Sequence, residues 1–321
     1  MDGLSAAMEG RLKLGTRGSA LALWQANWTK SELEKRWSGL TVELVPIKTT
    51  GDKILDVPLA KIGGKGLFTK EIDEALLDGR IDLAVHSMKD VPFQLPAGIE
   101  FAAVPQREDP RDAFISNGPK LQELEALRPQ ATIGTSSLRR QVQLRHRFPA
   151  FELVMLRGNV DTRLRKLAAG EFDGIILASA GLKRLGHENR ITQILDEDIM
   201  LSAVGQGALG IVCRTSDETT RNLLRVLDDS STRIAVTAER GLLRALGGSC
   251  QVPVAGRANL TGGDLTIKGL IASLDGKRVI AHELRGLADR ALELGLELGE
   301  KLLSMGAGEI LAEIAQYGAE R

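Results

Sequence analysis

Short strand-like segments alternate with helix-like segments along most of the chain, and this alternation limits the possible folds more than any other feature. Arg11–Gly15 alternates polar and apolar residues as a strand does, and the helix-like stretch Ala20–Trp37 follows after a short loop. Thr132–Gly134 and Leu138–Phe148 repeat the same order further along. Strands that alternate with helices are typical of α/β sheets. The sequence therefore predicts two α/β lobes of the kind found in periplasmic binding proteins.

Three further segments indicate how the chain is divided. Gln106–Asp112 is charged and interrupted by proline, so we expect a hinge there. Ser202–Gly210 is rich in glycine and is expected to lead a strand with Cys213 back to the first lobe. Val252–Arg285 has three strand-like segments separated by hairpin turns, and helix-like sequence follows it. We predict lobe 1 at residues 11–105 and 203–226, lobe 2 at 111–202, and a C-terminal α+β domain at 230–321.

Composition excludes several classes of protein. The chain has 321 residues and no apolar run of 18, which argues against a membrane-spanning protein. Its first residues lack the pattern of a secretory signal, and two cysteines give no disulfide framework, so we expect a cytoplasmic protein. The four histidines do not have metal-ligand spacing. A net charge of +0 argues against a general nucleic-acid binder.

The zero net charge hides a basic segment. Residues 131–166 contain eight lysines and arginines and two acidic residues, whereas residues 286–321 contain three basic and seven acidic residues. A local basic segment in a neutral protein indicates a small anionic ligand, although solvated helix faces would account for some of these charges. Arg139 and Arg140 follow the hydroxyl-rich loop Thr135–Ser137, and Arg157 and Arg163 surround the next helix start. Helix N-termini and arginine forks both bind carboxylates, so a ligand with several carboxylates is expected.

Two other strand ends carry candidate site residues. Thr16–Ser19 lies between a strand and a helix, where unpaired amides favour anions. Ile81–His86 runs into a polar loop with Lys89 and Asp90, at the end of a strand where α/β sheets bind ligands. An ordinary ion pair in the loop is the alternative for these two charges. The glycine- and lysine-rich stretch Thr50–Lys65 is interpreted as a mobile loop that closes over a ligand.

Cys250 lies on a loop after a predicted helix. Ile234–Leu246 is helix-like and stops at two glycines, and the residues before Pro253 favour an extended chain. Most free cysteines are small buried hydrophobic residues, which is our interpretation of Cys213. The strand–loop–helix pattern alone fits a two-lobed anion receptor that needs no catalysis. Neither a G-x-S-x-G motif nor a Walker A loop is present.

A set of uncommon strings then resembles one enzyme family over nearly the whole chain. The strings are TRGS at Thr16–Ser19, GGKGLF at Gly63–Phe68, VHSMKDVP at Val85–Pro92, REDPRDAF at Arg107–Phe114, GTSSLRR at Gly134–Arg140, LRGN at Leu156–Asn159, AVGQG at Ala203–Gly207 and ERGLLRALGGSCQVP at Glu239–Pro253. In this order they resemble porphobilinogen deaminase, also called hydroxymethylbilane synthase.

The resemblance implies a transferase of tetrapyrrole (porphyrin and haem) biosynthesis. It implies that Cys250 holds a dipyrromethane cofactor through a thioether bond, and that four porphobilinogen units join this primer head to tail with loss of ammonia. Hydrolysis then releases hydroxymethylbilane. Asp90 is implied as the catalytic residue, because a carboxylate stabilises the cationic azafulvene and assists proton transfer. A cytoplasmic monomer that binds porphobilinogen, without nucleic-acid or membrane partners, is also implied.

The resemblance assigns roles to further residues, with the site in a cleft between the two lobes. The implied cofactor contacts are Ser87, Lys89, Thr135, Ser136, Arg139, Arg140 and Gln206. The implied substrate contacts are Arg17, Ser19, Arg157, Arg163 and Arg184, and the implied active-site loop holds Lys61, Lys65 and Phe68. The chain departs from the family pattern at Asp161, where glycine is expected. Met1–Gly10 has no counterpart, so Met8 is an alternative start.

Overall fold

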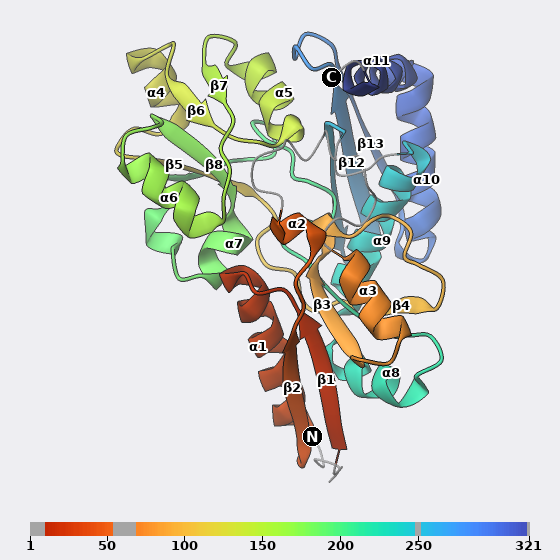
Figure 1. The fold of residues 1–321 in the computed structure, drawn as a ribbon. Coiled ribbons are helices and arrows are strands. Elements are labelled where there is room, and N and C mark those ends of the chain that lie inside the picture. Colours follow the sequence, from red (N-terminus) through yellow and green to blue (C-terminus); the bar gives the residue numbers. More distant parts are fainter. Residues whose placement is uncertain (1–9, 54–68, 248–251, 320–321) are drawn as a thin grey trace. The chain divides into compact units, whose positions relative to one another are not determined.

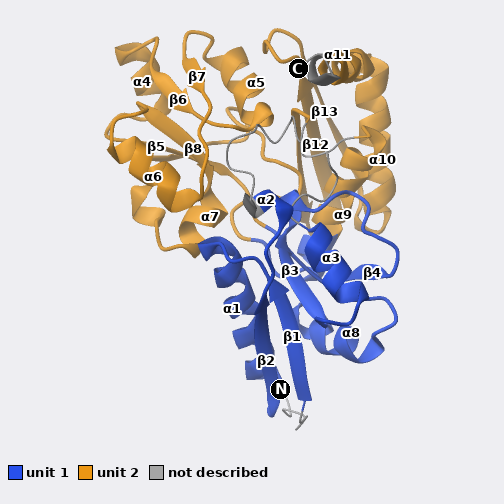
Figure 2. Cartoon of the chain, in the orientation of Figure 1, with its two compact units in different colours: residues 1–54, 64–107, 208–233 blue, residues 55–63, 108–207, 234–321 orange. Residues whose placement is uncertain are grey.

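The computed structural model describes residues 10–53, 69–247 and 252–319, which form two compact units (Figures 1 and 2). The described residues of unit 1 are 10–53, 69–107 and 208–233. Those of unit 2 are 108–207, 234–247 and 252–319. The chain therefore enters unit 2 at residues 107–108, returns to unit 1 at 207–208, and leaves it again within a helix at 233–234.

Unit 1 is built on a five-stranded mixed sheet. In spatial order its strands are β2 (Leu40–Pro46), β1 (Gly10–Thr16), β3 (Leu83–Ser87), β10 (Leu209–Arg214) and β4 (Ile99–Ala103). Strand β1 is parallel to β2 and β3, whereas β10 is antiparallel to β3 and β4. The strand that returns from unit 2 thus enters the first sheet in the opposite direction to its neighbour β3.

Helices cover both faces of this sheet because side chains alternate along its strands. The helices are α1 (Ala20–Arg36), α2 (Thr50–Lys53), α3 (Lys70–Leu77) and α8 (Glu218–Leu224), and a 3-10 turn at Arg225–Leu227 follows α8. Leu83 and Val85 of β3 belong to the apolar cluster that includes residues of α1 and α8. Ala84, between them, belongs to the cluster that includes α3. This period of two is the one expected of a strand with two buried faces.

Unit 2 begins with a second five-stranded sheet of the same pattern. Its order is β7 (Glu152–Val154), β6 (Thr132–Gly134), β8 (Gly174–Ala178), β5 (Asp112–Ser116) and β9 (Gln193–Ile194). Strand β6 is parallel to β7 and β8, and β5 is antiparallel to β8 and β9. Its helices are α4 (Leu121–Leu127), α5 (Leu138–Arg147), α6 (Val160–Ala168) and α7 (Ser179–Arg184), with a 3-10 turn at Glu188–Arg190. The antiparallel strands β5 and β10 therefore occupy equivalent places, each soon after the chain enters its unit.

The remainder of unit 2 is an α+β layer. The antiparallel strands are β11 (Val254–Thr261), β12 (Asp264–Ala272) and β13 (Val279–Leu287), packed against α9 (Ser230–Ala245), α10 (Ala291–Leu302) and α11 (Gly308–Ala319). A 3-10 turn at Ala288–Arg290 precedes α10, and a π turn at Leu303–Ala307 follows it. Gly295 allows α9 and α10 to pack closely, since a Cβ atom there would lie 2.0 Å from the carbonyl oxygen of Ala238.

The predicted fold class is confirmed: two α/β sheets and a C-terminal α+β part are present. The return of the Cys213 strand to the first sheet and the three-stranded hairpin layer are confirmed as well. Strands β4 and β9 were not predicted, and α2 lies in the stretch predicted as a loop. Asp112, the last residue of the predicted hinge segment, is fully buried and begins β5.

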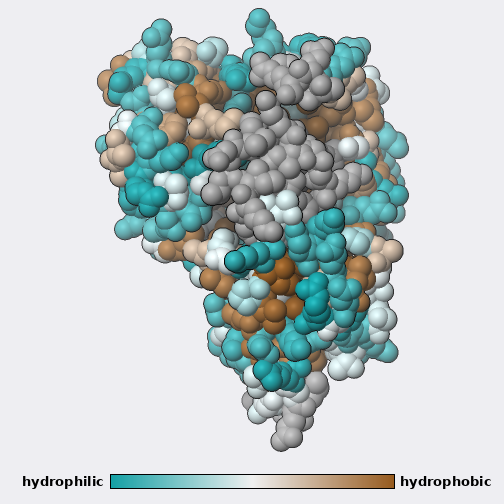
Figure 3. Space-filling view, viewed as in Figure 1, coloured by the Kyte–Doolittle hydropathy of each residue, from teal (hydrophilic) through white to brown (hydrophobic). Residues whose placement is uncertain are grey.

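Hydrophilic residues cover much of the face shown in Figure 3. Among the described residues, no helix is both long enough and apolar enough to cross a membrane.

Candidate active site

Asp90 lies directly after a buried strand of unit 1. Strand β3 continues into a 3-10 turn, Met88–Asp90, whose first residue is buried. The amide of Met88 donates to the carbonyl oxygen of Ala208 over 3.0 Å, and the amide of Val91 donates to the carbonyl oxygen of Met88 over 3.2 Å. The Asp90 side chain is exposed and has no hydrogen bond or ion pair to another described residue. A fixed backbone therefore presents a carboxylate whose oxygens are open to a ligand.

Two other predicted site residues share this strand end. The hydroxyl oxygen of Ser87 accepts a hydrogen bond of 2.8 Å from Nε2 of Gln25, a buried residue of α1. Lys89 is half-buried in the turn beside Asp90. The predicted placement of polar residues at the end of a buried strand is confirmed, and it puts a cation, a hydroxyl and a carboxylate on one short segment.

The loop after β1 has the predicted form of a helix cap. Ser19 caps α1, and its hydroxyl oxygen accepts a 3.3 Å hydrogen bond from the amide of Ala22. The hydroxyl of Thr16 donates to the carbonyl oxygen of Ala22 over 3.2 Å, which holds the loop against the first turn. Arg17, between these two residues, is half-buried.

His86 is a buried histidine next to these groups. Burial and, to a smaller extent, the charge of Arg17 together lower its pKa to about 4, so the ring is neutral near pH 7. Its Nε2 atom has no hydrogen-bond partner among the described residues. Strands β1 and β3 are paired at Gly15 and Ala84, so the β1 loop and the end of β3 lie near each other within unit 1.

In unit 2, the hydroxyl-rich loop after β6 is largely bonded to the protein itself. Thr135 is buried, and its hydroxyl oxygen accepts a 3.2 Å hydrogen bond from the amide of Ser137. The hydroxyl of Ser136 donates to the carbonyl oxygen of Leu156, the residue before Arg157. These bonds tie the start of α5 to the loop that leads into α6, so the two predicted arginine segments are neighbours.

Arg139 and Arg140 do not lie on an open surface. Both are buried at the start of α5, and both donate to the carboxylate of Asp112 at the start of β5 over 2.7 Å. Nη1 of Arg139 also donates to the carbonyl oxygen of Leu201 over 2.7 Å, and Nη1 of Arg140 donates to that of Ile176 over 2.9 Å. The sequence predicted that these arginines are available to a ligand, whereas in the structure each is paired with the carboxylate of Asp112.

Gln206 joins the same carboxylate. Its Nε2 atom donates to Oδ1 of Asp112 over 2.9 Å and to the carbonyl oxygen of Pro110 over 2.7 Å. Burial alone would raise the pKa of the Asp112 carboxyl, but the charges of Arg139 and Arg140 hold that pKa well below its usual range. Asp112 is therefore a buried anion that brings together three residues predicted to contact the cofactor.

Arg184 is hydrogen-bonded to Gly207, the residue at which the chain leaves unit 2. It ends α7, and its Nη2 atom donates to the carbonyl oxygen of Gly207 over 2.8 Å. Burial lowers the pKa of Arg184 to about 10, although the charge of Glu108 opposes this shift. Gly207 has φ +85°, and a Cβ atom there would lie 2.3 Å from the carbonyl oxygen of Glu108. Only glycine fits this close approach of the two crossing segments.

Arg157 and Arg163 lie around the start of α6 and are both half-buried. Nε of Arg163 donates to the carbonyl oxygen of Gly158 over 2.8 Å. Oδ1 of Asp161, the departure from the family pattern, lies 2.8 Å from Nε2 of His187, the residue before the 3-10 turn Glu188–Arg190. Its carboxylate thus has a partner other than these arginines.

Four predicted site residues, Lys61, Lys65, Phe68 and Cys250, lie outside the described residues. The predicted helix before Cys250 is present as α9, which ends at Ala245, and Gly247 has φ +60°. Cys213 is buried in β10, as predicted, and burial raises the pKa of its thiol to about 11.

Sequence reasoning missed two buried carboxylates. Asp112 is one, and its only sequence signal is an acidic residue directly before the apolar segment Ala113–Ile115. Glu239 of α9 is the other: it accepts hydrogen bonds from the amides of Gly205 over 2.7 Å and Ala258 over 2.9 Å. Both carboxylates therefore hold the segment that contains Gln206.

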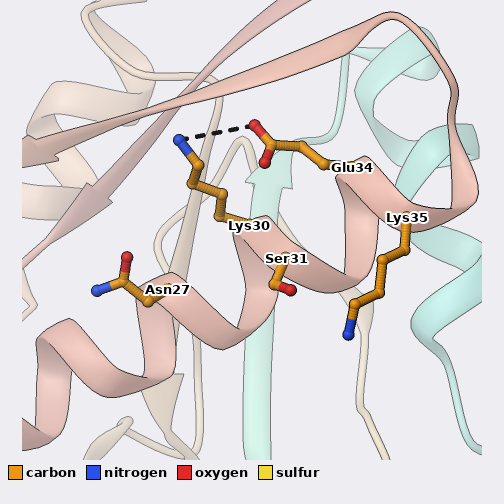
Figure 4. A pocket seen from close by; sticks show the side chains of 5 residues that line it. All are labelled: Asn27, Lys30, Ser31, Glu34 and Lys35. Atoms are coloured by element: carbon orange, nitrogen blue, oxygen red, sulfur yellow. Dashed lines mark ion pairs between the residues drawn. The ribbon is translucent and has the colours of Figure 1, made fainter.

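A surface hollow of about 510 Å³ in unit 1 is not part of this site. It is lined by Asn27, Lys30, Ser31, Glu34 and Lys35, which all belong to α1 (Figure 4). Lys30 and Glu34 form an ion pair of 3.6 Å across one helical turn. An exposed helix face with such a pair is ordinary surface structure.

Comparisons with known proteins agree with the sequence motifs. Residues 12–222 match the family model described as "Porphobilinogen deaminase, dipyromethane cofactor binding domain", and residues 233–304 match "Porphobilinogen deaminase, C-terminal domain". The porphobilinogen deaminase of Geobacter sulfurreducens is 54% identical over 97% of this chain and 97% of its own. That of Trichlorobacter lovleyi is 54% identical over 95% of this chain and 97% of its own.

Solved structures show a more distant likeness. A probable amino-acid ABC transporter extracellular-binding protein from Bacillus subtilis is 10% identical over 68% of this chain and 89% of its own, with a TM-score of 0.42. The BenM effector binding domain with its effector benzoate is 16% identical over 68% of this chain and 92% of its own, also with a TM-score of 0.42.

Proposed function

We propose roles for the residues of this site from the premise that the chain belongs to the porphobilinogen deaminase family. The chain is accordingly a transferase of tetrapyrrole biosynthesis, which condenses four porphobilinogen units head to tail, with loss of ammonia, and releases hydroxymethylbilane. The observation that carries this function is the match of both family domains along one chain, together with identity of 54% over nearly its full length. The individual residue roles below are proposals.

The described residues fit a dipyrromethane cofactor. When bound, this group supplies the primer to which the first substrate unit is joined, and its side chains are carboxylates. Unit 2 offers Arg139, which is buried next to one carboxylate and a second guanidinium, and the half-buried Arg157 and Arg163. A planar guanidinium suits a carboxylate because two N–H groups can bind both oxygens. We propose that Ser87, Lys89, Thr135, Ser136, Arg139, Arg140 and Gln206 hold the cofactor, directly or through a neighbour.

Asp90 is proposed as the catalytic residue. Loss of ammonia from porphobilinogen leaves a positive charge on the substrate, and a fixed carboxylate stabilises such a charge. Its open oxygens can also accept and return the protons that leave the pyrrole nitrogen and the coupling carbon. The side chain is exposed and has no partner among the described residues, which supports this role because an internal ion pair would already use its lone pairs.

We propose that Arg17, Ser19, Arg157, Arg163 and Arg184 bind carboxylates of the substrate and of the growing chain. Every added unit brings an acetate and a propionate, so successive units need successive cations. Arg184 is proposed with a second role, since it also bonds to the carbonyl oxygen of Gly207. Lys61, Lys65 and Phe68 are proposed to form a loop over the substrate.

Cys250 is proposed as the attachment point of the cofactor. The properties of the other cysteine support this choice by exclusion. Cys213 is buried in a central strand, and its thiol pKa of about 11 leaves very little thiolate near pH 7. We further propose that the protein works as a monomer in the cytoplasm, where two cysteines in 321 residues remain reduced.

Intact mass after denaturation tests this proposal. Protein from cells that make the cofactor is expected to exceed its sequence mass by two pyrrole units. Cys250→Ser should remove the excess, because the thioether cannot form, whereas the control Cys213→Ala should retain it. An unmodified wild-type chain, or an excess that survives Cys250→Ser, would contradict the attachment proposed here.

A further inference from the structure

Asp112 is the described residue around which the cofactor-binding part of unit 2 is organised. Its side chain is 0% exposed, and its two oxygens accept hydrogen bonds from Arg139, Arg140 and Gln206. These partners come from the start of α5 and from the segment that leads out of unit 2. One carboxylate therefore sets the positions of three side chains that are proposed to hold the cofactor.

The charges of this cluster do not balance. Two guanidinium groups face one carboxylate, and the other acceptors of the two arginines are the neutral carbonyl oxygens of Leu201 and Ile176. Burial lowers the pKa of Arg139, Asp112 raises it, and the neighbouring Arg140 lowers it. A buried positive charge without a counter-ion is unfavourable. The cluster is thus suited to receive one further anion.

The two arginines differ in how many of their nitrogen atoms are occupied. Arg140 donates from Nε, Nη1 and Nη2, with Asp112 and the carbonyl oxygen of Ile176 as acceptors. Arg139 donates only from Nη1. Its Nε and Nη2 atoms have no hydrogen-bond partner among the described residues. These two atoms form one edge of the guanidinium, which is the edge that can bind both oxygens of a carboxylate.

We propose that Asp112 is a positioning residue for cofactor binding. It holds Arg140 as an internal anchor and orients Arg139 so that its Nε–Nη2 edge receives a single carboxylate of the pyrrole chain. That carboxylate supplies the missing negative charge. The proposal rests on the proposed function, because it takes the ligand to be the dipyrromethane cofactor.

The test measures cofactor loading and stability in the full-length chain. Asp112→Asn, expressed in cells that make the cofactor, is expected to reduce the fraction of chains with the two-pyrrole mass excess about tenfold, the effect of losing one charge-assisted contact. The control is Asp173→Asn. Asp173 lies directly before β8, whereas Asp112 pairs with Ala178 at the other end of that strand. The carboxylate of Asp173 accepts hydrogen bonds from Arg128 and from the amide of Thr132. This control should load like the wild type.

A double variant separates positioning from a purely structural role. Asp112→Asn with Arg140→Gln removes one buried cation together with the carboxylate, so the thermal midpoint should recover most of what Asp112→Asn loses. Loading should remain low, because Arg139 is still not oriented. If loading recovers with the thermal midpoint, or if Asp112→Asn loads normally, the proposal is overturned.

A third variant applies where Asp112→Asn does not fold. Arg139→Lys keeps the charge but loses the two-pronged edge, so loading should fall while the thermal midpoint stays near that of the wild type. Normal loading of Arg139→Lys overturns the proposal. A wild-type chain without any mass excess would instead contradict the proposed function, so the two failures can be distinguished.

Discussion

Asp90 and Asp112 lie at strand ends of two sheets with the same pattern, but their environments are opposite. Asp90 follows β3 of unit 1, is exposed, and has no described partner. Asp112 begins β5 of unit 2, is fully buried, and binds two guanidinium groups and an amide. The first carboxylate is open to a substrate, and the second belongs to the framework.

The difference shows that charges paired inside the protein must be distinguished from charges open to a ligand before a cluster is assigned to ligand binding. The basic segment of unit 2 indicates a polyanionic ligand, yet two of its arginines already share an internal carboxylate. The charge that this segment offers to a ligand is therefore smaller than its composition suggests. The carboxylate of Asp90, which we propose as the catalytic group, has in contrast no such internal partner among the described residues.

The largest expected effect is on stability. Asp112→Ala leaves two buried guanidinium groups without their counter-ion, so the free energy of unfolding should fall by about 3–5 kcal/mol. Asp90→Ala removes an exposed side chain that has no partner in the described part of the chain, so it should change this free energy by less than about 0.5 kcal/mol. Urea unfolding followed by circular dichroism measures both. If both substitutions lowered the free energy of unfolding equally, the distinction between a structural Asp112 and an exposed Asp90 would be contradicted.

A smaller effect concerns how the stability of the folded chain depends on pH. The group expected to cause it is His86, four residues before Asp90 on the same strand end. Its pKa is about 4 in the folded chain and about 6.5 in the unfolded one. Between these values the unfolded chain binds more protons, so stability is lost as the pH falls from 6.5 to 4. Asp73 acts in the opposite direction, because burial raises its pKa to about 6 and the folded chain then binds the extra proton.

His86→Gln should therefore lose less stability than the wild type between pH 7 and pH 4.5, by on the order of 2 kcal/mol. Asp112 contributes little to this slope, because its carboxyl is ionised in the folded chain and, with an ordinary pKa of 3.8, largely ionised in the unfolded chain down to pH 4.5. Unfolding midpoints at several pH values measure the difference. Parallel pH profiles of the two proteins would show that His86 is not the group that titrates.

The smallest of the three effects concerns the half-buried arginines of unit 2. Arg157→Gln or Arg163→Gln should slow elongation about tenfold, since each variant loses one charge-assisted contact to the growing chain. Intermediates with fewer than four added units should then accumulate and be visible by intact mass. Arg165→Gln is the matched control, because Arg165 lies on α6 like Arg163 but is exposed. Normal turnover of Arg157→Gln without trapped intermediates would argue against successive use of these cations.

The sequence predicted the arrangement of strands and helices well, because side-chain periodicity is a local property. Ser19 as a cap, the turn after β3 and the burial of Cys213 could all be predicted from neighbouring residues. Strand β9 could not, since Gln193–Ile194 is too short to show a period. Strand β4 has more residues, but its burial depends on its position at the sheet edge beside β10.

The candidate site was predictable only in part, for a similar reason. Spacing along the chain placed Arg139 and Arg140 at a helix start, which is correct. It gave no sign that Asp112, the first residue of β5, pairs with both arginines of that helix. Long-range pairing of buried charges depends on the tertiary fold. For this reason the internal role of Arg140 emerges only from the structure.

The most direct measurement of the central claim is the single-turnover release of ammonia by cofactor-loaded Asp90→Glu. The longer side chain keeps the charge but displaces it, so the rate should fall about a hundredfold or more. The unfolding midpoint should stay within the error of the wild type, because Asp90 has no structural partner among the described residues. A near-normal rate in this variant would contradict the assignment of Asp90 as the catalytic carboxylate.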